Sequence, residues 1–163
     1  MLRTVKRHRT RATAGTFAIV ASQYNRRYVD GMLRAASATL RAAGVRKIIV
    51  VRVPGAFEIP VVTARLARAQ QRPLAAILCL GVVLRGETSH AQHIGQSVSH
   101  ALAQIQIQQE IPVIHEVLLL ENEGQAKARC LGRRYNRGAE AAQTALSMSR
   151  IMKRLASSLS GIC

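Results

Sequence analysis

Hydrophobic residues along the chain follow two alternating patterns. Four short runs of mostly aliphatic residues, many of them β-branched, are typical of buried strands. Between these runs, apolar residues recur every three or four positions, which is typical of helices that bury one face. The runs predict strands at residues 16–21, 47–53, 74–80 and 112–120.

The first two helical segments have recognisable ends. Gly44 stands where a glycine is expected just after a helix, in the left-handed conformation that closes many helix ends. The second helix is predicted over residues 56–70, where Pro60 is tolerated because it falls in the first turn. The apolar stripe of the first helix consists of Met32, Leu33, Ala36, Leu40 and Ala43.

Three further helices are predicted in the second half of the chain. Thr88 or Ser89 can cap a long helix, residues 123–130 form a short one, and the last starts near Asn136. The stripe of the long helix consists of Ile94, Val98, Ala101, Leu102 and Ile105. That of the last helix consists of Ala141, Ala145, Met148, Met152 and Leu155.

Strands and helices therefore alternate at the spacing of βαβ units. This order predicts a parallel sheet with helices on both faces. The length of 163 residues suits a single domain, predicted over residues 15–158 between a flexible basic arm (1–14) and a short tail (159–163). Alanine-rich helices and only 3% aromatic residues leave a thin core, so we expect the chain to cover its apolar helix faces by forming an oligomer.

The composition also bears on location. No apolar run reaches the roughly 20 residues needed to cross a bilayer. The N-terminus lacks an apolar signal core, so we expect a cytoplasmic protein. Of the three cysteines, Cys79 lies in an apolar run and is predicted to be a buried thiol.

The charge balance is strongly basic, with 24 Lys and Arg against 8 Asp and Glu, a net charge of +16. The arm holds five of the basic residues and no acid, which leaves +11 on the rest of the chain. Such a surface attracts phosphates, nucleic acid or anionic substrates. The alternative is that the basic residues only cover a solvated surface.

Two strand-to-helix junctions carry the candidate chemistry. Residues 53–58 (VPGAFE) leave the second strand, and Gly55 lets the backbone approach a ligand closely. The N–H groups of the following turn can bind carbonyl oxygens or an anion. Glu58 supplies a carboxylate there, although it can equally do no more than complement the helix dipole.

The second junction, residues 81–90 (GVVLRGETSH), joins the third strand to the long helix. A glycine, a hydroxyl pair and free N–H groups at a helix start resemble a phosphate-binding turn, although any capped helix start looks similar. His90, predicted one turn into the helix, titrates near neutrality and suits general acid–base catalysis, or is a structural residue. In parallel sheets such junctions meet at the carboxyl edge, where ligands bind.

The remaining histidines and arginines raise two further alternatives, a metal site and an anion clamp. His90 and His93 are neighbours on a helix, but His100 lies about 10 Å from His93 along the axis, too far to share a metal. No cysteine or carboxylate adds a ligand, so we expect no metal. Four arginines before the last helix form either a solvated loop or a clamp for phosphate, namely Arg129, Arg133, Arg134 and Arg137.

Taken in order, several segments resemble the 6,7-dimethyl-8-ribityllumazine synthase family of riboflavin biosynthesis. The two junctions carry the most specific part of the resemblance, which covers about residues 16–157. The matching segments are 22–25 (SQYN), 53–60 (VPGAFEIP), 81–90, 112–114 (PVI), 123–126 (EGQA) with Arg129, and 136–142 (NRGAEAA).

The resemblance implies a flavodoxin-like three-layer αβα sandwich with a four-stranded parallel sheet, assembled as pentamers that often form an icosahedral shell. It implies condensation of 5-amino-6-(D-ribitylamino)uracil with 3,4-dihydroxy-2-butanone 4-phosphate, without metal or cofactor, at a site between adjacent subunits. The short connection between Arg129 and Asn136 favours a shell, and an association with riboflavin synthase stays open.

The resemblance also implies roles for individual residues. His90 matches the proton-transfer residue, and Tyr24 the aromatic residue that stacks on the pyrimidine. Residues matched to substrate binding are Ala56, Phe57 and Glu58 for the ribityl chain, and Val82, Val83 and Leu84 for the pyrimidine edge. Those matched to phosphate binding are Glu87 and Thr88, with Arg129 from the neighbouring subunit.

Some positions depart from the family. His115 stands where an aromatic or apolar residue usually contacts the pyrimidine from the adjacent subunit, and Glu87 adds a carboxylate beside the phosphate turn. Residues 91–92 replace an aromatic–acidic pair, and Arg137 replaces a lysine. Two other functions stay open: a non-catalytic shell that binds polyanions, and a flavin-binding protein with the same fold.

Overall fold

Four parallel strands form one sheet in the order β2-β1-β3-β4. The computed structural model describes residues 15–69, 74–132 and 134–160. The predicted strands are confirmed, but β3 continues four residues past its expected end because Leu84 still pairs with Leu120 of β4. The strands are β1 (Thr16–Ser22), β2 (Lys47–Val53), β3 (Leu74–Leu84) and β4 (Val113–Leu120).

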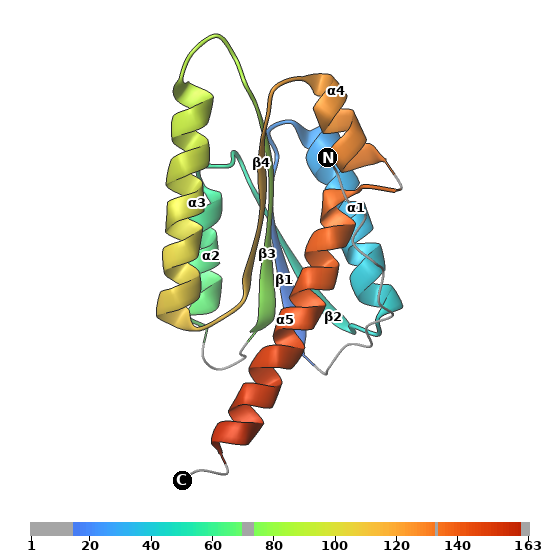
Figure 1. Cartoon of the computed structure of the whole chain (residues 1–163), viewed down its shortest axis with the longest axis vertical. Coiled ribbons are helices and arrows are strands. Elements are labelled where there is room, and N and C mark those ends of the chain that lie inside the picture. The colour runs from blue at the N-terminus through green and yellow to red at the C-terminus, as the bar shows by residue number, and fades with distance from the viewer. Residues whose placement is uncertain (1–14, 70–73, 133, 161–163) are drawn as a thin grey trace.

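Helices cover both faces of this sheet, which confirms the predicted three-layer αβα architecture (Figure 1). One face carries α2 (Ile59–Ala67) and α3 (His90–Gln109). The other carries α1 (Arg26–Ala42), α5 (Arg137–Leu159) and a short segment in which α4 (Glu123–Ala126) widens into the π-helical turn η1 (Lys127–Leu131). Over the described ranges, no helix combines the length and hydrophobicity needed to cross a bilayer.

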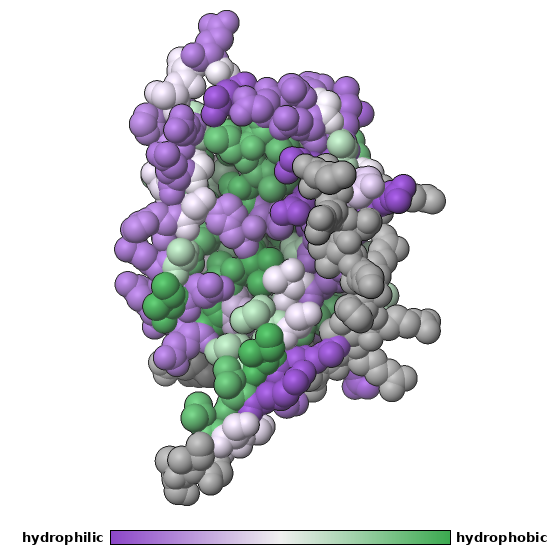
Figure 2. Space-filling model, viewed as in Figure 1, coloured by the Kyte–Doolittle hydropathy of each residue, from purple (hydrophilic) through white to green (hydrophobic). Residues whose placement is uncertain are grey.

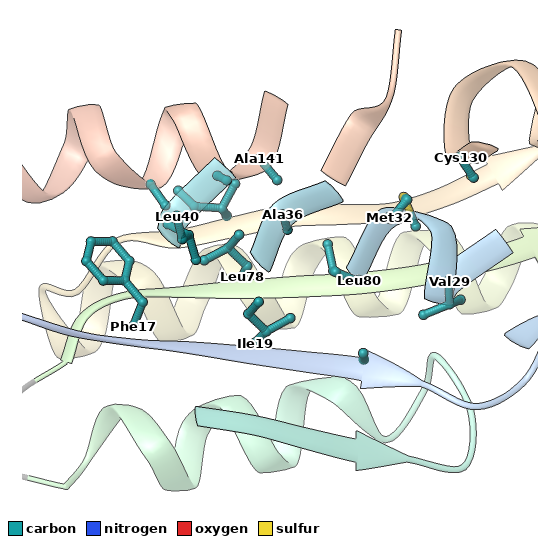
Figure 3. Packing of buried hydrophobic residues seen from close by; sticks show 14 of the residues in the cluster. Phe17, Ile19, Val29, Met32, Ala36, Leu40, Leu78, Leu80, Cys130 and Ala141 are labelled. Carbon is teal, nitrogen blue, oxygen red and sulfur yellow. The ribbon is translucent and has the colours of Figure 1, made fainter. Parts of the chain in front are cut away.

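Each face of the sheet has its own hydrophobic core. Beneath α1 and α5, Phe17 and Ile19 of β1 pack with Leu78 and Leu80 of β3 (Figure 3). The alternate residues, including Cys79, face α2 and α3. Because both faces are buried, the strands read as continuous apolar runs and not as an alternating pattern. Cys79 is fully buried as predicted, and burial raises the pKa of its thiol to about 12.

Several helix boundaries differ from the prediction. The second helix begins at Ile59 and not at residue 56, because the Glu58 carboxylate accepts a hydrogen bond from Gly55 N–H (2.8 Å) and closes residues 55–58 into a loop. Gly44 follows α1 with φ +94°, as expected of a C-terminal glycine. His90 is the first residue of α3 and does not lie one turn inside it.

The last helix extends beyond the sheet. It begins after Asn136, whose side-chain oxygen accepts a hydrogen bond from Gly138 N–H (2.9 Å). Its predicted stripe is buried at Ala141 and Ala145, but Leu155 is 50% exposed because the end of α5 passes the sheet edge (Figure 1). Apolar side chains lie along this protruding end (Figure 2). The basic arm, residues 1–14, and Cys163 lie outside the described residues.

The crossing of α5 over α1 predicts a strict requirement for glycine at position 138. A Cβ atom there would lie 2.0 Å from the carbonyl oxygen of Met32, which is rigid helix backbone. Gly138→Ala should therefore lower the free energy of unfolding by about 3 kcal/mol, the upper end of the usual cost of overpacking. Urea denaturation measures this change.

Gly95→Ala in α3 is the matched control. The nearest atom to its new Cβ would be Cδ2 of Leu119 at 3.7 Å, an ordinary contact. This variant should be as stable as the parent chain or more so, because alanine favours a helix over glycine by about 1 kcal/mol. Equal stabilities for the two variants would show that the α1–α5 crossing tolerates a side chain.

Candidate active site

A pocket of about 750 Å³ opens at the carboxyl edge of the sheet, between β1 and β3. The chain leaves β1 towards β2 through α1, whereas β3 lies on the other side of β1. The strand order thus reverses between β1 and β3, the point at which open α/β sheets bind ligands. Both junctions singled out in the sequence line this pocket: residues 55–58 from the first, and residues 82–84, Gly86, Thr88 and His90 from the second.

The loops after β1 and β2 form one wall and are held together by backbone hydrogen bonds. Gln23 N–H donates to the Val53 carbonyl (2.7 Å), and Tyr24 N–H to the Pro54 carbonyl (3.0 Å). The rings of Tyr24 and Phe57 are 73% and 60% exposed. Because large aromatic side chains are usually buried, two exposed rings at a pocket favour a planar or apolar ligand group.

Asn25 connects this wall to the sheet. Its backbone is left-handed (φ 54°), a conformation that asparagine tolerates better than most residues. Its side-chain amide donates to the Val82 carbonyl at 2.9 Å. β1 pairs with β3 only as far as Leu80, so the β1-facing edge of residues 82–84 borders the pocket. Backbone polar groups on this edge can bind the edge of a ring.

The start of α3 forms the opposite wall. Four side chains spaced by three or four residues lie on one face of the helix and line the pocket: His90, His93, Ile94 and Ser97. Ser89 occupies the N-cap position without a side-chain hydrogen bond, so the first N–H groups of α3 are open to an anion. Thr88 lines the pocket, whereas Glu87 is exposed and is not among the lining residues.

Glu58 lies at the mouth of this pocket. One of its oxygens, Oε2, accepts the Gly55 N–H. A carboxylate offers about four acceptor positions, so Glu58 can still accept hydroxyl groups of a ligand. It also occupies the N-cap position of α2, which is compatible with the dipole role considered from the sequence.

His115 lies on the edge strand β4, away from this pocket. Val117 N–H donates to its Nδ1 (3.2 Å), so Nδ1 is unprotonated. Ser99 Oγ donates to the Gly95 carbonyl (2.7 Å) and lies 2.7 Å from His115 Nε2, so it accepts the Nε2 proton. Both contacts assign a neutral Nε2–H imidazole. Partial burial also lowers the pKa of His115 from its ordinary value.

A groove of about 690 Å³ lies between α3 and β4 beside this histidine. Ser99 and Val117 line it, together with the charged or titratable residues Arg85 and His100. Arg85 forms an ion pair with Glu121 (3.3 Å). His93 and His100 thus line different hollows. Within the described parts of the chain, no three His, Cys, Asp or Glu side chains gather where they could hold a metal.

The other side of β4 carries a buried acidic residue. Glu116 is only 7% exposed, and its Oε2 lies 3.2 Å from Nε of Arg137, whose Nη1 also donates to Glu140. Burial raises the pKa of Glu116 to about 7, although Arg137 acts in the opposite direction. Glu116 and Glu140 therefore both hold Arg137, which makes it a poor candidate for binding phosphate.

The other arginines of the predicted clamp differ from Arg137. Arg134 lies over the ring of Tyr135, at 5.5 Å from its centroid, and Arg133 lies outside the described residues. Arg129, on η1, is half-buried and takes part in none of the ion pairs found in the described part of the chain. It is the clamp residue best able to meet an anion from another molecule.

The pocket thus gathers most of the predicted site residues, but not Glu87, His115 and Arg129 of the same chain. It also contains residues to which the sequence analysis gave no role in binding. Asn25 and Ser97 are the clearest cases, and Ser99 supports His115 from outside. Ser97 could have been predicted from the sequence, because it lies nearly two helical turns after His90 on the same face of the helix. The contacts of Asn25 and Ser99 depend on tertiary structure.

Comparison with known proteins identifies similar chains. A family model described as 6,7-dimethyl-8-ribityllumazine synthase matches residues 14–153. A protein of that name from Stenotrophomonas maltophilia (strain R551-3) is 40% identical over 141 residues, 85% of this chain and 90% of its own. Another from Coxiella burnetii (strain CbuG_Q212) is 41% identical over 140 residues, 85% and 91% of the two chains. One from Xanthomonas campestris pv. campestris (strain B100) is 39% identical over 147 residues, which cover 89% of this chain and 94% of that protein.

The contacts of His115 predict its protonation state. It should titrate below the ordinary histidine pKa of about 6.5 and carry its neutral proton on Nε2, because Val117 N–H occupies Nδ1. Long-range ¹⁵N–¹H correlation spectra recorded against pH report both properties, and His115→Gln assigns the signal. Ser99→Ala should abolish protection of the Nε2 proton from exchange, whereas Ser97→Ala should preserve it. An Nδ1–H tautomer would contradict the assignment.

The raised pKa of Glu116 predicts that this residue makes a pH-dependent contribution to the free energy of unfolding. Its pKa is higher in the folded chain than in the unfolded chain, so the folded state binds the proton more tightly. Raising the pH from 5 to 8 should therefore destabilise the parent chain relative to Glu116→Gln, by on the order of 2–3 kcal/mol. Urea denaturation at both pH values measures this difference. Parallel pH profiles would mean that Arg137 keeps Glu116 ionised throughout.

Proposed function

The chain belongs to the 6,7-dimethyl-8-ribityllumazine synthase family of riboflavin biosynthesis enzymes, and we propose that it condenses 5-amino-6-(D-ribitylamino)uracil with 3,4-dihydroxy-2-butanone 4-phosphate. The observation that carries this proposal is the pocket at the strand-order reversal. It combines exposed aromatic rings, free strand edges, an open helix N-terminus and a histidine, the groups needed for a planar substrate and an anionic one.

The pyrimidine substrate binds along the sheet edge. Tyr24 stacks on the ring, and the backbone of Val82, Val83 and Leu84 binds its polar edge. The ribityl chain lies along Ala56 and Phe57, and its hydroxyls donate to Glu58. The exposure of both aromatic rings and the short pairing of β1 support this orientation.

The phosphate substrate binds at the start of α3. Thr88 and the first N–H groups of the helix bind its phosphate, with Arg129 of an adjacent subunit on the other side. Glu87 belongs to the same turn and contributes through its backbone, since a carboxylate would repel the phosphate. Arg129, unlike Arg137, has no carboxylate holding it in the described chain, which supports its role.

The reaction proceeds by condensation and elimination. The substrate amine attacks the butanone carbonyl and forms an imine with loss of water. Loss of a proton and departure of phosphate give an enol that tautomerises to a ketone. The ribitylamino nitrogen then attacks this ketone, and a second water leaves on ring closure. His90 transfers protons in these steps, and holding both reactants together supplies much of the acceleration.

The site is proposed to lie between subunits. His115 and Arg129 lie outside the pocket of their own chain, and the end of α5 exposes Ile151, Leu155 and Leu159. A ring of subunits would bring β4 and η1 of one chain to the pocket of the next, and we propose a pentamer in the cytoplasm. An icosahedral shell of pentamers and an association with riboflavin synthase are extensions of this proposal.

The proposal predicts a defined pattern of activity and complementation. Purified protein mixed with both substrates should produce the fluorescent lumazine, and His90→Ala should lower kcat by at least about 100-fold. Arg129→Ala should lower kcat/KM for the phosphate substrate. Co-expressing these two variants should restore activity at about a quarter of the sites, because a randomly mixed interface can pair an intact His90 with an intact Arg129.

Tyr24→Ala combined with His90→Ala is the matched control. Both residues line the pocket of the same chain, so every mixed site keeps one defect and activity should not recover. Absence of product from the parent chain would refute the reaction. If neither pair of co-expressed variants regained activity, only the sharing of sites between subunits would be refuted.

A further inference from the structure

The reaction proposed above does not account for the strong positive charge of the chain. Asp30 is the only acidic residue among the first 57 residues, and it is already paired with Arg26 (3.2 Å) and Arg52 (2.9 Å). The remaining acidic residues that form ion pairs also do so within the chain: Glu116, Glu121, Glu123 and Glu140. The excess cations elsewhere therefore have few acidic partners.

Three of these cations form a regular row on α1. Arg27, Arg34 and Arg41 are each seven residues apart and exposed. Seven residues make nearly two helical turns, so the three side chains leave the same face at intervals of about 10.5 Å and span about 21 Å. We call this row the α1 arginine stripe. The buried residues Val29, Met32, Ala36 and Leu40 occupy the opposite side of the helix.

The stripe is not used by the fold or by the proposed site. None of its arginines takes part in an ion pair found within residues 15–69, 74–132 and 134–160, and none lines the substrate pocket. Cζ of Arg27 lies 6.0 Å from the ring centroid of Tyr28, a cation–π contact that involves no carboxylate. Just beyond the helix, Arg46 and Lys47 continue the positive surface.

We propose that the α1 arginine stripe binds the phosphate backbone of nucleic acid without regard to sequence. A small anion can meet only one arginine at this spacing, whereas an extended row of phosphates can meet all three. The guanidinium fork matches the oxygens of a phosphate. None of the large exposed apolar residues of the described chain lies on α1, so the stripe offers neither a stacking platform for bases nor an anchor for a membrane.

The test compares two variants of the full chain with equal loss of charge. In the first, Arg27, Arg34 and Arg41 are changed to Gln. In the second, three exposed residues outside α1 that do not form a row, Arg65, Arg68 and Arg154, are changed to Gln. Fluorescence anisotropy with a labelled 20-base-pair duplex DNA gives the dissociation constant between 50 and 250 mM KCl. Lumazine formation serves as the control for folding and should be unchanged in both.

Loss of three phosphate contacts should reduce the slope of log K against log [KCl] by about 2.7 for each bound subunit, and weaken binding at 100 mM KCl at least about tenfold. The second variant should show a much smaller change in both the slope and the affinity. Equal losses in both variants, or no binding by the parent chain at 100 mM KCl, would overturn the proposal. The proposal would also be overturned if the stripe variant lost affinity for phosphatidylglycerol vesicles but kept its affinity for DNA. That result would assign the stripe to membranes.

Discussion

The candidate site depends on unequal strand lengths at the carboxyl edge of the sheet. β1 pairs with β3 as far as Leu80, and β3 then continues to Leu84 beside β4 alone. This difference leaves one side of β3 unpaired beyond Leu80, beside the loops that follow β1 and β2. The hydrogen bond from Asn25 to the Val82 carbonyl closes the lower end of the gap and sets how closely the Tyr24 loop approaches β3.

The edge strand β4 has a different role on each of its faces. On one side the neutral His115 is held by Ser99 and by the backbone of Val117, and on the other the buried Glu116 is held by Arg137. Neighbouring positions on a strand point to opposite faces, so these two titratable residues belong to separate environments. Both are placed by contacts within the chain, so their geometry does not depend on another molecule.

Much of the fold could be predicted because its signals are local. Buried parallel strands need continuous apolar runs, and Gly44 and Asn136 mark helix ends by their own backbone or side-chain chemistry. The start of α2 was predicted too early because residues 56–58 look helical, whereas the contact between Glu58 and Gly55 makes them a loop. The position of η1 against α1 likewise depends on tertiary structure, because Gly31 leaves room for the Cys130 carbonyl.

Predicting the site was harder for the same reason. The junction residues could be placed because parallel strands bring their carboxyl ends together, and the resemblance supplied roles for them. The distinction between Arg129 and Arg137 could not be made from the sequence, where both are basic residues in one cluster. It depends on Glu116 and Glu140, which lie 21 and 3 residues from Arg137 and form ion pairs with that guanidinium, whereas neither forms one with Arg129.

The distribution of acidic residues links the site to the rest of the surface. Glu58, Glu116, Glu121, Glu123 and Glu140 follow β2 or belong to β4 and the segments after it, near the carboxyl edge, and each is held within the chain. These pairs limit the positive charge near the pocket at the carboxyl edge. On the outer face of α1, Asp30 is the one acidic residue of the helix, and it is paired with Arg26 and Arg52 and with none of the stripe arginines. The positive charge proposed above to bind long polyanions therefore lies outside the pocket, where few carboxylates oppose it.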